Sequence, residues 1–446
     1  MGFTLPSSKK KQYLSGSDWI INALDYMLKR ETCAGNISQV VLMLNGVPDG
    51  LLLQERLNHF IGKFPVIRGS VARDINLAPY WRIPRESRTE ASVKVHTLDR
   101  VFSAEDTFLL FEKNVNSMFR SDAEHLAFHL VHRENGQSSL AMTFDHRLFD
   151  GRGAEMFLSL FQKYLSEENG PAAAEDFQWS APAKLSQWME KFHAGKMVNR
   201  KLIALSKTSA GALPIPPEKN RGFRFTLIPL NQSETDLLYD TACSEAGYLM
   251  EMPYLLSVVI QSFHELFKSR GLAAPSYLIP LSIDMRRGED LKQELFFNHV
   301  SYLFFQVPQD RATDLKGMIG IIKKQMYDQI QSGLPKDIQE ACLLTRIAPL
   351  PVLDKLFRIP VEGKIASFCF SHVGKSAYLS DELMGVKIDN IFHMPRVPVP
   401  PGLGFFFNYF NGRLNLIISH LDGLLQEDEI LMLEAGLKEK LRPCQR

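Results

Sequence analysis

Hydrophobic residues recur along the first part of this chain with the spacings of helices and strands in turn. After the polar pair Ser17-Asp18, apolar residues return at every third or fourth position, which predicts an amphipathic helix with a polar start. Continuous apolar runs bounded by turn residues predict strands instead. We expect, in order, that helix, a strand at 37–44, a helix at about 51–64 closed by Pro65, and a strand beginning at 66–69.

A β-hairpin and a helix are predicted on either side of a polar stretch that contains His146. An Asn-Gly pair at 135–136 lies between two apolar runs, and this arrangement is the strongest short signal for a hairpin. Beyond Gly151, apolar residues fall on a single helical stripe. We therefore expect paired strands at 125–132 and 139–144, with His146 leaving the inner strand and a packed helix after Gly151.

The second half of the chain repeats the alternation of strands and covering helices, and no tandem repeat of solenoid length is present. A second Asn-Gly pair, at 411–412, predicts another hairpin. The expected elements are strands at 223–230, 276–283, 296–307 and 365–371, helices at 231–246, 253–268 and 314–331, and hairpin strands at 404–410 and 413–420.

This order predicts an α/β (α+β) protein with two lobes, each a mixed sheet covered by helices. The chain of 446 residues is long enough for two or three domain equivalents. We place the N-terminal lobe at 1–175 and the C-terminal lobe at 176–446. The composition changes up to about 221, and the aromatic residues there favour a crossing segment with a short helix around Trp188 over a disordered linker.

Composition excludes several classes of protein. The hydrophobic content of 45% and charged content of 23% are typical of a soluble globular protein, and a net charge of +1 without a basic block argues against nucleic-acid binding. Five scattered cysteines without a Cys-x-x-Cys pattern fit a reducing compartment. No apolar run approaches the roughly 18 residues of a membrane span. The polar, basic start lacks the apolar core of a signal peptide, so we expect a cytoplasmic protein.

The strongest candidate for catalysis is the spacing of His146, Asp150 and Gly151. Imidazole has an unperturbed pKa of about 6.5, which allows proton transfer near neutral pH. A carboxylate four positions later can fix the ring or anchor the turn, and a glycine lets the backbone approach a substrate closely. These features suit a general base at a strand end, but they also suit a polar strand end followed by an Asp-Gly turn.

Other reactive side chains are expected to be structural. His125, His129 and His132 lack a carboxylate or cysteine that would complete a metal site, so we expect no bound metal. Cys369 lies in an apolar strand without an electropositive neighbour, and we do not expect a nucleophile there. His146 therefore remains the main candidate.

The whole chain resembles the thioester-dependent acyltransferase superfamily that includes chloramphenicol acetyltransferase, peptide-synthetase condensation domains, wax ester synthases and alcohol acyltransferases. Its signature, His-His-x-x-x-Asp-Gly, is matched at 145–151 by Asp-His-Arg-Leu-Phe-Asp-Gly. Asp145 replaces the first histidine, as in dihydrolipoamide acyltransferases, and Phe297 and His372 replace a glycine and an asparagine of other motifs. Further segments resemble superfamily motifs in the same order, at 64–68, 280–286, 297–301, 370–374 and 409–414.

The resemblance implies two lobes that meet at a tunnel with His146 at its middle. An acyl thioester, on coenzyme A or on the phosphopantetheine arm of a carrier protein, would come from one side as a co-substrate, without a bound cofactor. The acceptor, a small molecule or a lipid, would come from the other side. His146 would take the proton of the acceptor as it attacks the thioester carbonyl.

The resemblance also implies roles for residues around this histidine. Asp150 would point away from the substrate and pair with an arginine of the second half, either Arg286 or Arg287, although these two arginines also suit a solvated basic turn. The Gly151 backbone N–H would face the developing oxyanion. Asn298 and Ser371 would line the tunnel, or would serve only to turn the chain.

Three functions remain open at this point. The first is a free-standing acyltransferase that forms an ester or an amide from an acyl thioester. The second is a stand-alone condensation enzyme that acts on substrates bound to acyl or peptidyl carrier proteins. The third is a non-catalytic descendant that binds a thioester or a partner protein, and the presence of His146, Asp150 and Gly151 together argues against it.

Overall fold

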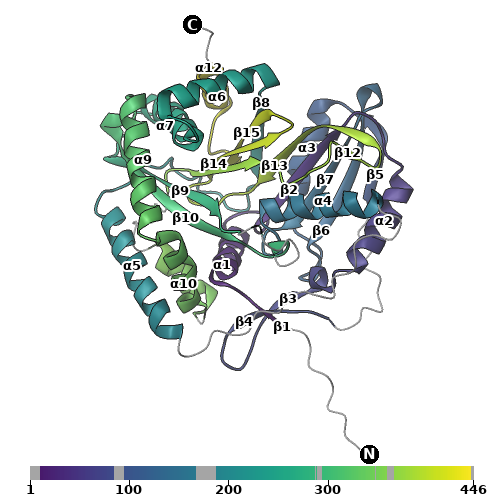
Figure 1. The fold of residues 1–446 in the computed structure, drawn as a ribbon, viewed down its shortest axis with the longest axis horizontal. Helices are drawn as coiled ribbons and strands as arrows, with labels where there is room; N and C mark the ends of the chain where they lie inside the picture. The colour runs from purple at the N-terminus through teal and green to yellow at the C-terminus, as the bar shows by residue number, and fades with distance from the viewer. Residues whose placement is uncertain are drawn as a thin grey trace, which may run out of the picture.

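The computed structural model describes residues 11–84, 95–166, 187–286, 288, 294–346, 348–358 and 366–442. The described residues form two lobes that lie side by side, and each lobe is built on a six-stranded sheet (Figure 1). The predicted α/β class, with two mixed sheets covered by helices, is confirmed. Within these ranges no helix combines the length and the apolarity that crossing a bilayer requires.

The first sheet has the strand order β12-β13-β2-β7-β6-β5. Its neighbouring strands are antiparallel except for β5 and β6, which are parallel. Helices α2 and α4 cover the face that carries Val40, and α3 covers the face that carries Val41. The bounds are β2 (Ile37–Leu44), β5 (Val95–Phe102), β6 (Leu126–Arg133), β7 (Ser138–Asp145), β12 (Glu382–Leu383), β13 (Val386–Pro395), α2 (Gly50–Gly62), α3 (Ala104–Val115) and α4 (Gly151–Ser166).

The second sheet has the strand order β10-β9-β11-β14-β15-β8. Strand β11 is parallel to both of its neighbours, and the remaining pairs are antiparallel. Helices α6, α9 and α12 each pack on α7. The bounds are β8 (Phe223–Pro229), β9 (Ser276–Asp284), β10 (Val300–Pro308), β11 (Cys369–Lys375), β14 (Leu403–Phe410), β15 (Arg413–Leu421), α6 (Gln232–Ala246), α7 (Glu251–Ser269), α9 (Leu315–Gln331) and α12 (Glu427–Leu441).

Helix α1 (Gly16–Glu31) joins the two lobes (Figure 1). Its Trp19 is fully buried in the core of the first lobe, whereas its Ser17 hydroxyl donates to the Val300 carbonyl of the second lobe at 2.7 Å. It also packs on α10 and α11. The remaining bounds are α5 (Trp188–Ser206), α10 (Leu334–Thr345), α11 (Leu350–Arg358), and β1 (Lys11–Tyr13), β3 (Ser70–Arg73) and β4 (Pro79–Arg82) of a three-stranded sheet.

The two lobes also exchange segments of chain. Strands β12 and β13 come from the second half of the sequence but complete the first sheet, where β13 pairs with β2. In addition, the segment before β10 reaches the first lobe, because the Phe297 N–H donates to the Leu148 carbonyl at 2.6 Å. The predicted lobe boundary at 175–176 lies outside the described residues. Residues 382–395, which the prediction assigns to the C-terminal lobe, complete the first sheet.

Both predicted Asn-Gly hairpins are confirmed, as β6–β7 and β14–β15. The predicted strand at 66–69 is wrong, because the chain forms a 3-10 helix at Pro65–Arg68 and enters β3 only afterwards. The strand predicted at 296–307 begins at Val300, because Phe297 has a φ of 69° and is held on the first lobe. The helix around Trp188 is present, and it extends to Ser206.

Candidate active site

The loop at 145–151 connects the end of β7 to α4. The His146 N–H donates to the Asn36 carbonyl at 2.9 Å, which extends the β2–β7 pairing by one bond beyond the strands. The N–H groups of Leu148 and Phe149 turn back to the Asp145 carbonyl, at 2.9 and 3.3 Å. These backbone bonds fix the backbone at His146, and the residue is half-buried.

Asn298 determines which nitrogen of the His146 ring carries the hydrogen. The Asn298 Nδ2 donates to the His146 carbonyl at 2.9 Å, so the amide oxygen faces the ring. That oxygen, Oδ1, lies 3.1 Å from the His146 Nδ1, and because an amide oxygen only accepts, Nδ1 must carry the hydrogen. In the neutral ring, Nε2 therefore keeps its lone pair, which is the form that a general base requires.

Asn298 is in turn held by Asp18 of α1. The Asn298 N–H donates to the Asp18 Oδ1 at 2.8 Å. The other carboxylate oxygen accepts from the Ser15 N–H and the Ser15 hydroxyl, at 2.8 and 2.7 Å, so the same side chain closes the capping box of α1. The Ser-x-x-Asp spacing of Ser15 and Asp18 marks a helix start, but it carries no signal for a role of Asp18 in the site.

Asp150 and Arg286, predicted as a pair across the two halves, lie in contact. The Arg286 Nη2 donates to the Asp150 Oδ1 at 2.7 Å, and the Gly153 and His299 N–H groups donate to the same carboxylate at 2.8 and 3.0 Å. Burial alone would raise the pKa of Asp150, but the Arg286 charge and these hydrogen bonds outweigh it, so the pKa lies below its ordinary value. The pair thus joins the motif loop to the second lobe as an ion pair.

The two glycines at the start of α4 differ in their surroundings. A Cβ on Gly153 would lie 2.6 Å from the Leu295 carbonyl, so this position tolerates only glycine without a shift of the backbone. A Cβ on Gly151 would lie 3.5 Å from the ring of His393, which is an ordinary contact. Gly153 therefore serves the packing of the two lobes, whereas Gly151 leaves space beside His393.

Asp145, at the position where the resemblance leads us to expect a histidine, forms a buried network with Arg147. The Arg147 Nη2 lies 2.6 Å from the Asp145 Oδ2, and the His125 Nδ1 lies 2.9 Å from the same oxygen. Burial alone would raise the pKa of Asp145, but Arg147 and His125 outweigh it and hold the pKa well below its usual range. Arg147 also approaches Asp25 at 3.7 Å, and Asp25 accepts from the Asn36 N–H at 2.9 Å. The contacts of Arg147 with Asp145 and Asp25 therefore support the strand end next to His146.

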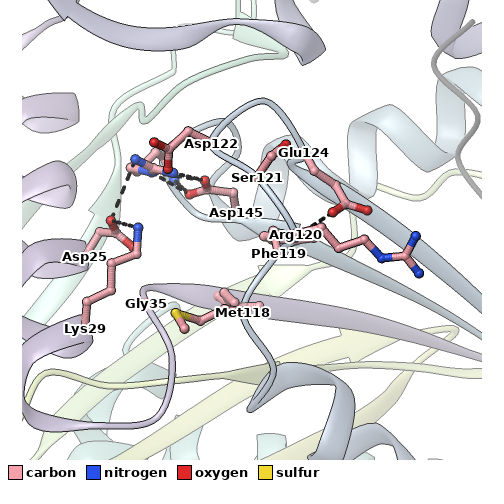
Figure 2. Close-up of a pocket in the computed structure, with 12 residues that line it drawn as sticks. Asp25, Lys29, Gly35, Met118, Phe119, Arg120, Ser121, Asp122, Glu124 and Asp145 are labelled. Carbon is pink, nitrogen blue, oxygen red and sulfur yellow. Dashed lines mark hydrogen bonds and ion pairs between the residues drawn. The ribbon is translucent and has the colours of Figure 1, made fainter. Parts of the chain in front are cut away.

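The network borders a cavity of about 270 Å³ on the Asp145 side of the loop (Figure 2). Its lining is mixed in charge, since Lys29 pairs with Asp25 at 2.8 Å and the Arg120 N–H donates to the Glu124 carboxylate at 2.7 Å. The His146 ring is not among its lining residues. This cavity therefore adjoins the motif loop without containing the candidate base.

The other predicted residues are placed as follows. Ser371 lies on β11, half-buried, and accepts from the Ser282 hydroxyl on β9 at 3.1 Å. Burial lowers the pKa of His372 to about 4 and raises the pKa of Cys369 to about 12, so neither group is charged at neutral pH. Arg287 lies outside the described residues. Among the residues that the structure describes, no group of three metal-binding side chains comes together.

Comparison with sequences gives no relative, since neither a protein-family profile nor a curated protein matches the chain. Comparison with solved structures does identify the fold. The trichothecene 15-O-acetyltransferase from Fusarium sporotrichioides is similar with a TM-score of 0.72 and 15% identity, over 97% of this chain and 94% of that chain.

Two further structures show the same similarity. The first condensation domain of the CDA synthetase has a TM-score of 0.69 and 11% identity, over 97% of this chain and 95% of that chain. Polyketide synthase associated protein 5 from Mycobacterium tuberculosis has a TM-score of 0.61 and 13% identity, over 96% of this chain and 98% of that chain. The chain therefore has the same two-lobed fold as these acetyltransferase and condensation-domain structures.

Proposed function

We propose that the protein is an acyltransferase that moves an acyl group from a thioester to a hydroxyl or amine acceptor, with His146 as the general base. The hydrogen bond from the His146 Nδ1 to Asn298 supports this proposal most directly, because it leaves Nε2 free to take a proton. The fold agrees with it, since similar structures include an acetyltransferase and condensation domains.

In this mechanism Nε2 of His146 removes the proton from the acceptor oxygen or nitrogen as that atom attacks the thioester carbonyl carbon. The tetrahedral intermediate then collapses, the carbon–sulfur bond breaks, and the imidazolium returns the proton to the leaving sulfur. No covalent acyl-enzyme forms. General-base catalysis of this kind contributes about 10² to 10⁴ in rate, and alignment of the two substrates adds to it.

The surrounding residues would support this step without reacting. Gly151 begins α4, and the positive end of the helix dipole there would favour negative charge on the thioester oxygen. Asp150 and Arg286 would hold the loop in position across the two lobes. Ser371 is proposed to line the substrate tunnel. Metal or tightly bound cofactor chemistry is not needed for any of these roles.

The donor is proposed to be either a coenzyme A thioester or an acyl group on the phosphopantetheine arm of a carrier protein. The similarity to condensation domains favours a second candidate function, condensation of substrates bound to acyl or peptidyl carrier proteins. A small molecule or a lipid is the acceptor in the first case.

A reducing, cytoplasmic location is also proposed. The cysteines at 33, 243, 342 and 369 are free thiols, which supports this location.

The test is release of free thiol from coenzyme A thioesters and, separately, from acylated carrier proteins, measured with and without acceptors and checked by mass spectrometry of the product. Release from coenzyme A supports the free-standing acyltransferase, and release from carrier protein alone supports the condensation enzyme. The His146→Ala variant is expected to lose this activity. The matched control is His193→Ala, which removes an exposed histidine of α5. Acceptor-dependent release from neither donor would overturn both candidate functions.

A further inference from the structure

A second histidine, His393 of β13, lies beside the motif loop. A Cβ built on Gly151 would be 3.5 Å from both Nδ1 and Cε1 of its ring. The strand register explains this position, because His393 pairs with Val40, which pairs with Met142 of β7. Paired residues of antiparallel strands point to the same face of a sheet. His393 therefore lies on the same face of the sheet as Met142. It reaches the start of α4 from β13, whereas His146 follows β7.

A buried carboxylate orients the His393 ring. Glu155 of α4 has an exposed fraction of 0%, and its Oε1 lies 2.6 Å from the His393 Nε2. Its other oxygen accepts from the Ser376 hydroxyl at 2.9 Å and the Ala377 N–H at 2.5 Å. Burial alone would raise the pKa of Glu155, but His393 and these hydrogen bonds outweigh it and keep the pKa below its ordinary value. A carboxylate only accepts, so Nε2 of His393 carries a hydrogen.

Nδ1 is the ring atom left for another partner. Among the described residues no hydrogen bond to Nδ1 is formed, and the side chain retains an exposed fraction of 9%. Since Nε2 carries the hydrogen, Nδ1 of the neutral ring is an acceptor. It faces Gly151 at the start of α4, where a Cβ would lie at 3.5 Å, an ordinary contact distance.

We propose that His393 contacts the acceptor substrate, and that its Nδ1 accepts a hydrogen bond from a second hydroxyl or N–H group near the group that is acylated. This inference rests on the proposed acyl transfer and narrows its acceptor to polyols, amino alcohols or diamines. Two hydroxyl or N–H groups of one acceptor substrate would then contact two imidazole rings. His146 would contact the group that is acylated, and His393 would contact the neighbouring group. Glu155 is a positioning residue for His393.

A purely structural role of His393 would be to link β13 to α4 through Glu155. Replacement by glutamine separates the two roles, because the longer amide retains a donor toward Glu155 and removes Nδ1. We expect His393→Gln to lower the preference for vicinal diols over mono-alcohols of the same carbon number about fivefold to tenfold, the value of one hydrogen bond. If His393 were only a structural link, the substitution would change the activity with both kinds of acceptor equally. The preference for vicinal diols over mono-alcohols would then stay as in the wild type.

A binding measurement makes the test independent of turnover. The protein labelled with ¹⁵N-histidine is titrated with glycerol, ethanolamine and propanol, and the His393 signals are assigned by their loss in His393→Gln. We expect the Nδ1 signal to shift with glycerol and ethanolamine and to move less with propanol. If this shift occurs without thiol release, acceptor binding at His393 is supported and the proposed acyl transfer is refuted. If the His393 signal shifts with none of the three compounds, or shifts equally with all of them, the proposal for His393 is refuted.

Discussion

Replacement of Arg286 by methionine would leave the Asp150 carboxylate buried without its counter-charge. Both side chains are almost fully enclosed, with exposed fractions of 5% and 3%, and Nη2 lies 2.7 Å from Oδ1. The Gly153 and His299 N–H groups would remain as partners of the carboxylate, but neither carries a charge. Removal of one member of a buried ion pair costs about 3 to 5 kcal/mol. We expect Arg286→Met to lose this amount in free energy of unfolding at neutral pH.

Urea unfolding followed by fluorescence and circular dichroism measures this loss. The control is Arg413→Met, which breaks an exposed pair with Asp389 at 3.4 Å, with exposed fractions of 46% and 44%. An exposed pair of this kind contributes about 0 to 1 kcal/mol. If Arg286→Met is as stable as Arg413→Met, the pair with Asp150 does not hold the two lobes as the structure indicates.

The pH dependence of the same deficit has a defined sign. The pKa of Asp150 is lowered in the folded protein, so its charge contributes stability that is present above the unfolded pKa, about 3.9, and is lost as the pH falls through the folded value. In Arg286→Met burial without the counter-charge raises the pKa of Asp150 instead, so the folded variant takes up a proton before the folded wild type as the pH falls. The deficit in free energy of unfolding should therefore shrink progressively as the pH falls from neutral toward the lowered folded pKa of the wild type. A deficit that grows as the pH falls would refute the assignment.

Three further predictions follow from the site. Asn298→Leu removes the amide oxygen that accepts the hydrogen bond from the His146 Nδ1. We expect kcat to fall about 10- to 100-fold with little change in KM. An unchanged kcat would show that Asn298 does not determine the tautomer of His146. Gly153→Ala forces a Cβ to within 2.6 Å of the Leu295 carbonyl and should lower the melting temperature, whereas Gly151→Ala should fold normally; equal stability of the two variants would contradict this difference. Burial raises the pKa of the Cys342 and Cys369 thiols to about 12, so iodoacetamide at pH about 8 should label them only after unfolding. Labelling of these thiols in the native protein, measured by peptide mass spectrometry, would contradict this prediction.

Local signals in the sequence were sufficient for much of the fold. The Asn-Gly pairs at 135–136 and 411–412 locate both hairpins because the turn type restricts these positions to a few residues. The start of α1 follows from its polar cap, which the structure resolves as the Ser15–Asp18 capping box. By contrast, the residues at 296–299 were predicted as part of a strand that in the structure begins only at Val300. The hydrogen bond from Phe297 to Leu148 in the first lobe explains the later start, and no local pattern indicates it.

The site residues that the sequence analysis missed depend on contacts between distant parts of the chain. His393 and Glu155 are 238 positions apart, and no local pattern connects them. Asp18 lies 280 positions from Asn298, the predicted tunnel residue that it holds, and Asp18 looks locally like a helix-cap residue. His146, Asp150 and Gly151 were found because they lie within six consecutive residues of the chain. Arg286 was found only through the resemblance of its segment to a known motif, and the structure places it at Asp150.

The most direct measurement compares steady-state thiol release by the wild type and by His146→Ala, with an active thioester donor and acceptor at saturating concentrations. Circular dichroism and the melting temperature verify that the variant is folded, and His193→Ala serves as the control. Loss of the imidazole should reduce kcat by about 10² to 10⁴ while thioester binding is retained. A folded His146→Ala variant with the turnover of the wild type would show that this histidine is not the base.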